Sequence, residues 1–358
     1  MPRGGIKFTF IITRSALSSE GPRNFTLALI SLLRSFGVDV KYNVIANPLI
    51  LLLKELYYVI RGYVIVFPFV KGYELLAILF AMPLSTPSRA RIVIVNHDVH
   101  GLYESKGSLL WRFLIIMRSG KLLNFPLSRI TMVYVSRYSK YSSYHVTGCR
   151  HVLVKGLILY PVSRSHLRAS RSKDHSMKIP YKILIFAKAA KMLNEDFWNV
   201  IGKCFEGFVK QGKDFELTIM GGGSPSTVEA VKTIICKYLG SEVLKRTVLR
   251  FNVSNEERDR VIEQSDLMIY PLSTEGLGMP IFEAIMKGVP VLSARQTALI
   301  EFVPLQIYPY RDFRYPDFCE ALINALVNYD KLIRYVENVK KKVTMITLTN
   351  LKQLLQML

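Results

Sequence analysis

Two glutamates, Glu275 and Glu283, stand eight positions apart in residues 268–292, which read MIYPLSTEGLGMPIFEAIMKGVPVL. Glu275 lies in a loop that ends at Gly278, and Glu283 falls in the first turns of a predicted helix that begins near Pro280. Both carboxylates can therefore face the carboxyl end of the preceding strand, which is where ligands bind in a parallel α/β sheet. A glycine loop at a helix N-terminus suits a phosphate. The stretch predicts a ligand site.

Polar side chains also follow two other predicted strands. Lys188 and Lys191 come after the strand 181–186, and His97 comes after an earlier buried strand. A polar residue at the carboxyl end of a strand is placed to touch a substrate, and a surface or capping role for the histidine stays open. A metal role has little support, because no third ligand is evident beside His97 and His100.

Strands and helices alternate along the chain, which predicts an α/β fold with parallel sheets. Gly21 lies in the first predicted βα turn, where a glycine permits close approach to a ligand but a plain turn explains it equally well. The alternation breaks in a polar, serine-rich and basic segment and then restarts. We expect an N-terminal domain over 1–162, a linker over 163–178, a C-terminal domain over 179–340 and a helical tail over 341–358 that can return to the N-terminal domain. Further predicted elements are a helix over 73–84 and strands over 289–293 and 305–308.

Positive charge is concentrated in the N-terminal half. Residues 1–165 contain 21 Lys and Arg against 6 Asp and Glu, whereas the remainder contains 27 against 21. Such a field favours anionic partners: nucleic acid, an anionic membrane surface or a phosphorylated substrate. A generally basic surface with no such partner is the alternative.

The cysteines and the apolar segments indicate a compartment. Cys149, Cys204, Cys236 and Cys319 are far apart and form no CxxC pair, so we expect neither a zinc site nor a disulfide. A reducing cytoplasm fits. The N-terminus lacks a signal-peptide layout, and charges interrupt the apolar region 48–83, so we expect no transmembrane segment. The expected location is cytoplasmic, with a peripheral position on the inner face of the cell membrane as an extension of this expectation.

The central stretch resembles a known family. TEGLGMPIFEAIMKGVPVL is similar to the donor-site signature of retaining GT-B glycosyltransferases of the GT4-like group (glycosyl transferases group 1), in which seven residues separate two glutamates. Upstream, FNVSNEERDRVIEQSDLMIYPLSTEG resembles the run into the same loop. The resemblance covers most of residues 181–304 and is weaker in the N-terminal half. It implies a GT-B fold, with two Rossmann-like doubly wound parallel-sheet domains facing a central cleft.

The resemblance assigns roles to the central residues. Glu275 matches the glutamate that contacts the donor sugar, and Glu283 matches the one that binds the nucleotide ribose. Gly276, Leu277 and Gly278 match the loop that holds the sugar and diphosphate. A carboxylate suits two neighbouring hydroxyls because it accepts two hydrogen bonds.

Four further positions are carried over from the family. Lys188 matches the arginine that follows the strand, and Lys191 is the candidate for the family's lysine, although its spacing of three positions is short. Both cations would neutralise the diphosphate leaving group. His97 matches the N-domain histidine near the sugar, and Gly21 stands in the first loop, where the family has a double glycine.

The implied reaction is retaining transfer of a sugar from a nucleoside-diphosphate-sugar donor to an acceptor hydroxyl. A lipid-linked or other membrane-associated glycan is the expected acceptor. No Asp-x-Asp motif is present, so no metal and no resident cofactor are expected. No specific nucleic-acid partner is predicted. The alternatives are a non-catalytic GT-B-fold protein that binds anionic partners, and a nucleotide-sugar epimerase or phosphorylase.

Overall fold

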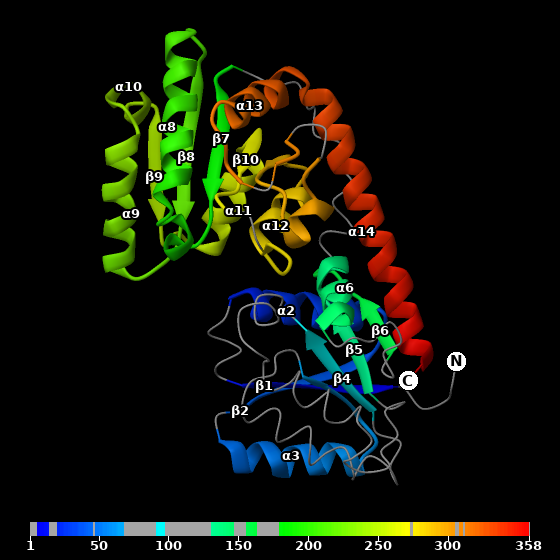
Figure 1. The fold of residues 1–358 in the computed structure, drawn as a ribbon. Helices are drawn as coiled ribbons and strands as arrows, with labels where there is room; N and C mark the ends of the chain where they lie inside the picture. Colours follow the sequence, from blue (N-terminus) through cyan, green and yellow to red (C-terminus); the bar gives the residue numbers. More distant parts are fainter. Residues whose placement is uncertain are drawn as a thin grey trace. The chain divides into compact units, whose positions relative to one another are not determined.

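The computed structural model describes residues 6–13, 20–45, 47–67, 91–96, 130–146, 155–162, 179–272, 275–304, 308–310 and 312–357. The chain divides into two compact units (Figure 1). The N-terminal unit comprises residues 1–168 and 343–358, and the C-terminal unit comprises residues 169–342.

The N-terminal unit is built on a six-stranded sheet in the order β2-β1-β3-β4-β5-β6, with every neighbouring pair parallel. Helices α2 and α3 lie on opposite faces of this sheet (Figure 1). The strands read as nearly continuous apolar runs because both faces of a parallel sheet are buried; Phe10 and Ile65, for example, are fully buried. The elements are β1 (Lys7–Thr13), α2 (Glu20–Ser35), β2 (Asp39–Ile45), α3 (Pro48–Ile60), β3 (Val64–Phe67), β4 (Arg91–Asn96), β5 (Ile130–Tyr134), α6 (Arg137–Val146) and β6 (Lys155–Ile158).

The C-terminal unit contains a five-stranded parallel sheet in the order β11-β10-β7-β8-β9. The central strand, β7, is flanked by β10 and β8, so the segments that follow β7 and β10 meet at one edge of the sheet. The strands are β7 (Tyr181–Phe186), β8 (Phe215–Gly221), β9 (Thr247–Phe251), β10 (Leu267–Ile269) and β11 (Val291–Leu292). The helices are η3 (Ala189–Met192), α8 (Glu195–Lys210), α9 (Pro225–Tyr238), α10 (Ser241–Leu244), α11 (Asn255–Gln264), α12 (Met279–Met286), η4 (Thr297–Glu301), α13 (Asp317–Val327) and α14 (Tyr329–Met357).

Helix α14 belongs to both units. Its first part lies in the C-terminal unit, and its residues from 343 onward lie in the N-terminal unit. There Thr347 accepts a hydrogen bond from the backbone N–H of Tyr160 at 3.2 Å, and Asn350 donates to the carbonyl of Ile158 at 2.8 Å. These contacts fasten the end of the helix to the segment after β6.

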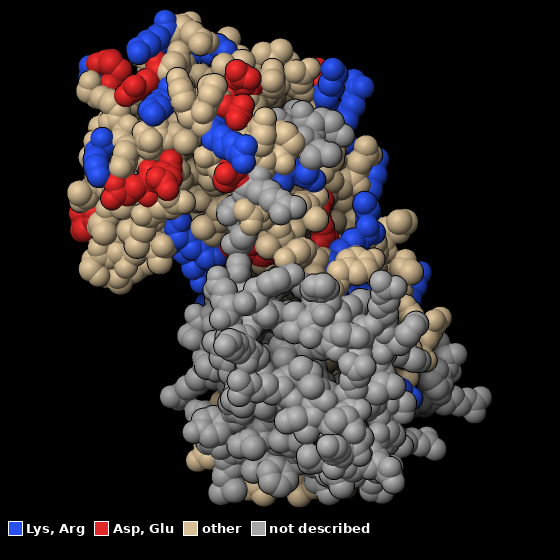
Figure 2. All heavy atoms as spheres, viewed as in Figure 1, with Lys and Arg blue, Asp and Glu red and all other residues tan. Residues whose placement is uncertain are grey.

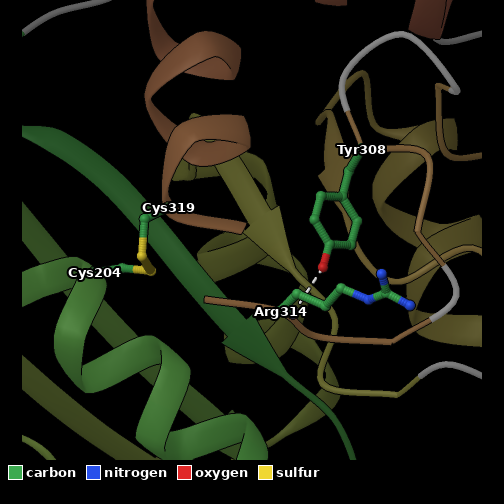
Figure 3. Close-up of a disulfide and its surroundings, with 4 residues drawn as sticks. All are labelled: Cys204, Tyr308, Arg314 and Cys319. Atoms are coloured by element: carbon green, nitrogen blue, oxygen red, sulfur yellow. Dashed lines mark hydrogen bonds between the residues drawn. A yellow bond between two sulfur atoms is a disulfide. The ribbon is translucent and has the colours of Figure 1, made fainter. Parts of the chain in front are cut away.

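A disulfide joins Cys204 to Cys319, which corrects the expectation that the cysteines stay unpaired (Figure 3). The two residues are 115 positions apart in sequence, but α8 packs against α13 and brings their Cα atoms to 5.0 Å. Sequence spacing could not reveal this pair because the contact is made by tertiary packing. Nearby, the hydroxyl of Tyr308 accepts from the backbone N–H of Arg314 at 2.9 Å, and burial raises the pKa of this tyrosine to about 12.

Several other expectations meet the structure. Gly21 is not in a loop, because α2 begins at Glu20 and Gly21 is its second residue. The strand expected over 289–293 is shorter, Val291–Leu292. The helix expected over 73–84, the linker over 163–178 and residues 305–307 of the expected last strand lie outside the described residues. Within the described part of the chain, no helix is both long enough and apolar enough to cross a bilayer.

One buried acid in the N-terminal unit leads to a prediction. Glu55 of α3 is 2% exposed, and among the described residues neither of its carboxyl oxygens has a hydrogen-bond partner. Burial raises the pKa of Glu55 to about 9. Because the folded-state pKa lies above the unfolded one, the stability contribution is complete below the unfolded value of about 4.5 and is lost as pH rises towards 9.

We therefore expect the free energy of unfolding to fall by up to about 1.4 kcal/mol per pH unit between about pH 5 and 8, and we expect Glu55→Gln to remove this slope. Urea unfolding across this pH range measures it. Asp39→Asn, at an exposed acid of β2, is the control. Equal slopes in wild type and Glu55→Gln would contradict the assignment.

Candidate functional site

Glu275 and Lys191 meet at the edge of the C-terminal sheet where β7 and β10 end. Lys191 lies in η3, directly after β7, and Glu275 lies in the segment after β10. Because β7 and β10 are parallel neighbours, these two segments start side by side. The ammonium of Lys191 forms an ion pair with Glu275 Oε1, and the carboxylate side chain is 16% exposed. The structure thus brings a predicted sugar-binding glutamate together with a predicted diphosphate-binding lysine, although Lys191 follows Lys188 at a shorter sequence spacing than in the family.

Tyr270 forms a hydrogen bond with the same carboxylate. Its hydroxyl donates a hydrogen bond to Glu275 Oε1 at 2.7 Å, and its side chain is almost fully buried. Burial, together with the charge and hydrogen bond of Glu275, raises the pKa of Tyr270 well above its usual value. The phenol therefore remains a donor at any physiological pH. Nothing in the sequence singles out Tyr270 beyond its place at the end of the apolar run LMIY, although a buried tyrosine usually finds a hydrogen-bond partner.

The backbone of Glu275 is fixed by η4. Thr297 Oγ1 accepts from the Glu275 N–H at 2.7 Å and donates to the Glu275 carbonyl at 2.8 Å. The N–H of Ala298 also donates to this carbonyl, at 3.2 Å. Thr297 has a φ of 51°, a conformation that is strained for a β-branched residue and marks functional sites. Three hydrogen bonds therefore set the position from which the carboxylate projects.

Gly278 shapes the entry into α12. It has a φ of +76°, and a Cβ there would lie 3.2 Å from Leu299 Cδ2. The backbone conformation therefore favours glycine, and a side chain would also need Leu299 to shift. The preceding Leu277 is buried, and Gly276 is partly exposed. Pro280 falls in the first turn of α12, as the sequence predicts. The loop from Glu275 to Gly278 thus runs into the N-terminus of a helix, where backbone N–H groups can receive an anion.

Glu283 lies on α12 and faces a basic residue. Its Oε2 is 3.8 Å from Nε of Arg258, which comes from α11, and the two side chains are 14% and 15% exposed. Arg258 was not singled out from the sequence, because a lone arginine in the charged run NEERDRVIEQ carries no distinguishing pattern. Glu283 is therefore largely buried beside a positive charge.

Lys188 and the glycines after β8 lie near the same edge. Lys188 is exposed, and its carbonyl accepts from the N–H of Lys191 at 2.9 Å. At Gly221 a Cβ would lie 2.5 Å from the carbonyl of Ala187, so the two strand ends approach too closely for a side chain. The side chain of Asn252 accepts from the N–H of Gly223 at 2.9 Å and donates to its carbonyl at 3.2 Å. These glycines therefore serve the turn.

Two predicted site residues are not part of this arrangement. His97 lies outside the described residues. Gly21 belongs to α2 of the N-terminal unit. The predicted site residues that follow β7 and β10 at this edge of the sheet are Lys188, Lys191, Glu275, Gly276, Leu277 and Gly278, and Glu283 lies farther along the chain, on α12.

Comparisons with known proteins agree with this geometry. Residues 166–312 match the family model described as "Family 4 Glycosyltransferase in conflict systems". No curated protein sequence matches the chain.

Solved structures share the fold at low sequence identity. Sucrose-phosphate synthase from Thermosynechococcus elongatus superposes with a TM-score of 0.63 at 13% identity, and each chain is covered over 98% of its length. An α-glucosyltransferase in complex with UDP and a 13-mer DNA superposes with a TM-score of 0.62 at 13% identity over 99% of both chains. The pneumococcal O-GlcNAc transferase GtfA, in complex with UDP and GlcNAc, superposes with a TM-score of 0.60 at 13% identity over 86% of this chain. This chain covers 59% of the length of GtfA.

The two parallel sheets match those of GT-B glycosyltransferases, and the matched residues 166–312 include the whole Lys191–Glu275–Glu283 arrangement. The chain thus has a two-domain GT-B fold, and its residues 166–312 match a family of GT4 glycosyltransferases.

Proposed function

We propose that the chain transfers a sugar from a nucleoside-diphosphate donor to an acceptor hydroxyl with retention of the anomeric configuration. The observation that carries this proposal is the contact of Lys191 and Tyr270 with one oxygen of Glu275, at the carboxyl edge of the sheet and at the start of the loop into α12. A nucleoside diphosphate as donor is supported by UDP, which is named in two of the similar structures.

Each group has a task in this reaction. Glu275 orients the sugar and stabilises the positive charge that develops at its reacting carbon. Lys191, Lys188 and the N-terminus of α12 receive the negative charge of the leaving diphosphate. The leaving phosphate then helps to deprotonate an acceptor that attacks on the same face, so Glu275 need not be a covalent nucleophile. With lysines and a helix N-terminus in this role, we propose a reaction without a metal.

Glu283 binds the ribose in this proposal. A carboxylate can accept from two neighbouring hydroxyls, and the charge of Arg258 holds Glu283 in place. His97 is proposed to approach the donor sugar, and Gly21 to approach the donor through the N-terminal end of α2. Both assignments rest on the family resemblance.

The acceptor is proposed to be a lipid-linked or other membrane-associated glycan. Its support is the uneven charge: the excess of Lys and Arg is concentrated in residues 1–165. By contrast, Figure 2 shows Lys and Arg intermixed with Asp and Glu over the described surface of the C-terminal unit. A basic surface favours an anionic lipid carrier or its membrane.

Glu283→Ala tests the donor assignment. We expect the KM for the nucleoside-diphosphate sugar to rise about 10- to 100-fold, because a hydrogen bond to a charged group is worth about 1.5–3 kcal/mol. The measurement is initial rates of donor hydrolysis and transfer with a panel of nucleoside-diphosphate sugars, together with UDP binding by calorimetry. Glu229→Ala, at an exposed glutamate of α9 that pairs with Lys232, is the control and should leave both unchanged.

The outcomes separate the alternatives. Transfer by the wild type that weakens in Glu283→Ala supports the proposal. Interconversion of donor sugars without acceptor indicates an epimerase, and release of sugar phosphate by inorganic phosphate indicates a phosphorylase. UDP binding without turnover indicates a non-catalytic protein. Equal donor affinity in wild type and Glu283→Ala would refute the ribose assignment.

A further inference from the structure

Helix α3 of the N-terminal unit presents large apolar side chains to solvent. Ile50, Leu53, Tyr57 and Ile60 are 47%, 60%, 52% and 70% exposed, and Leu56 beside them is 37% exposed. Their spacing of three and four residues places them on one side of the helix, within roughly a third of its circumference. They form a continuous stripe along the helix, which we call the α3 outer face.

The opposite side of α3 is also apolar, but it is buried. Leu51 and Val59 are 2% and 1% exposed and belong to the core. Tyr58 is also buried, and its hydroxyl accepts from Asn43 of β2 at 2.9 Å, which locates the contact with the sheet. The α3 outer face therefore has no role in packing the sheet. A helix that is apolar all round, yet has one side in solvent, points to an apolar partner for that side.

Positive charge accompanies this face. Arg61 follows the last residue of α3, is exposed, and places its guanidinium 5.6 Å from the centroid of the Tyr57 ring. Lys54 is partly exposed and donates to Asn43 at 3.2 Å. The acid of this helix, Glu55, is buried on the other side. A face of aliphatic and tyrosine side chains with a cation at its end has the composition of a helix in the interfacial layer of a bilayer.

The charge of the N-terminal half distinguishes between two possible partners for the α3 outer face, a second copy of this chain and a lipid surface. Residues 1–165 carry 21 Lys and Arg against 6 Asp and Glu. A second copy of this chain would bring an equally basic unit against the same face and would be repelled. An anionic lipid surface offers apolar depth for the side chains and phosphate for the cations.

We propose that the α3 outer face inserts into the interfacial layer of an anionic bilayer, with Arg61 against the lipid phosphates. The interaction joins apolar burial by α3 to the electrostatic attraction of the basic unit. It concerns a surface outside the donor site, and it holds or fails independently of the transfer reaction.

Co-flotation of the full chain with vesicles tests the proposal, in the absence of any donor. The vesicles are phosphatidylcholine alone, or phosphatidylcholine with phosphatidylglycerol. We expect binding to the mixed vesicles and little binding to phosphatidylcholine alone. Leu53→Gln combined with Ile60→Gln should weaken binding about tenfold or more, because the apolar part of the interaction is lost. High salt should also weaken the binding of the wild type to the mixed vesicles, because it screens the electrostatic attraction.

A matched control separates this face from general surface hydrophobicity. Val327 of α13 and Met345 of α14 are 74% and 63% exposed, so Val327→Gln with Met345→Gln removes a comparable amount of exposed apolar surface elsewhere. This variant should bind like the wild type. Ile60→Trp supplies a second readout, since its fluorescence should shift to the blue with mixed vesicles and be quenched by brominated lipid.

Three results would overturn the proposal. They are equal vesicle binding by wild type and the Leu53, Ile60 double variant, an Ile60→Trp emission that stays insensitive to brominated lipid, and a wild-type dimer that the double variant converts to a monomer. The last would make the α3 outer face a subunit interface. Because UDP binding and donor turnover are measured without vesicles, failure here leaves the proposed reaction untouched.

Discussion

Glu275→Gln is expected to lower turnover by about two to three orders of magnitude, the effect typical for removal of one preorganised electrostatic group at a developing charge. The amide keeps the size of the side chain and can still accept from Tyr270, but it removes the negative charge that Lys191 faces. The expected signature is a fall in kcat with a smaller change in the KM for the donor, because the charge matters most in the transition state.

Lys191→Met tests the partner of this carboxylate. We expect a comparable loss, and we expect the Glu275→Gln, Lys191→Met double variant to lose less than the product of the two single effects, since residues in one ion pair act as a unit. Kinetic constants for the four proteins give the coupling directly. Lys232→Met provides the matched control, because Lys232 pairs with Glu229 on α9 and should leave turnover unchanged.

The same four proteins expose an error in the assignment. If the two single effects multiply in the double variant, Lys191 and Glu275 act separately, and the ion pair is irrelevant to the reaction. If Glu275→Gln keeps wild-type turnover, Glu275 is not the residue that stabilises the transition state.

The parallel α/β class and the position of the candidate site follow from the sequence because both depend on local patterns. Apolar runs such as VIVF and YKILIF, each followed by turn residues, predict buried parallel strands, and both form strands in the structure. The loop before α12 could also be predicted, because a glycine before a helix and a proline in its first turn form a recognisable local sequence pattern. The family resemblance assigned Lys191 and Glu275 to one donor site, but that β7 and β10 are neighbouring strands is known only from the structure.

The supporting contacts could not be predicted, since each is made by residues far apart in sequence. Thr297 is 22 positions from Glu275 in sequence. Its two hydrogen bonds to the Glu275 backbone are made with a positive φ, and a threonine in the sequence does not indicate such a backbone conformation. Arg258 looks like one of several charges on a polar helix until α11 packs near α12. Gly21 shows the opposite failure: this glycine was predicted to lie in a turn, but α2 begins at Glu20 and includes both Gly21 and Pro22. Proline is tolerated in the first turn of a helix, so the pattern fits either structure.

Reducing the disulfide is expected to lower the stability of the C-terminal unit substantially. The chain-entropy model gives a contribution of about 4–5 kcal/mol for a loop of this length, and measured values are more often about 2–4 kcal/mol. The cysteines close a segment of 115 residues that contains β8 to β11 and both glutamates of the site. Opening it increases the freedom of the unfolded chain at the segment that carries the chemistry.

Urea unfolding with and without dithiothreitol measures this effect in the wild type and in Cys319→Ser. Trp198 reports on the C-terminal unit, since it is fully buried in α8 and donates to the carbonyl of Met192 at 2.7 Å. A Trp111→Phe background removes the other tryptophan, so that unfolding of the two units is not averaged. Reduced wild type should match Cys319→Ser, and both should unfold at lower urea than the oxidised wild type.

Cys236→Ser is the control for this experiment, because Cys236 is the free, exposed cysteine among the described residues. It should keep the full difference between oxidised and reduced protein. A midpoint that does not move on reduction would contradict a disulfide between Cys204 and Cys319. If the midpoint falls as expected, the C-terminal unit is less stable in a reducing cytoplasm than in a compartment where disulfides persist.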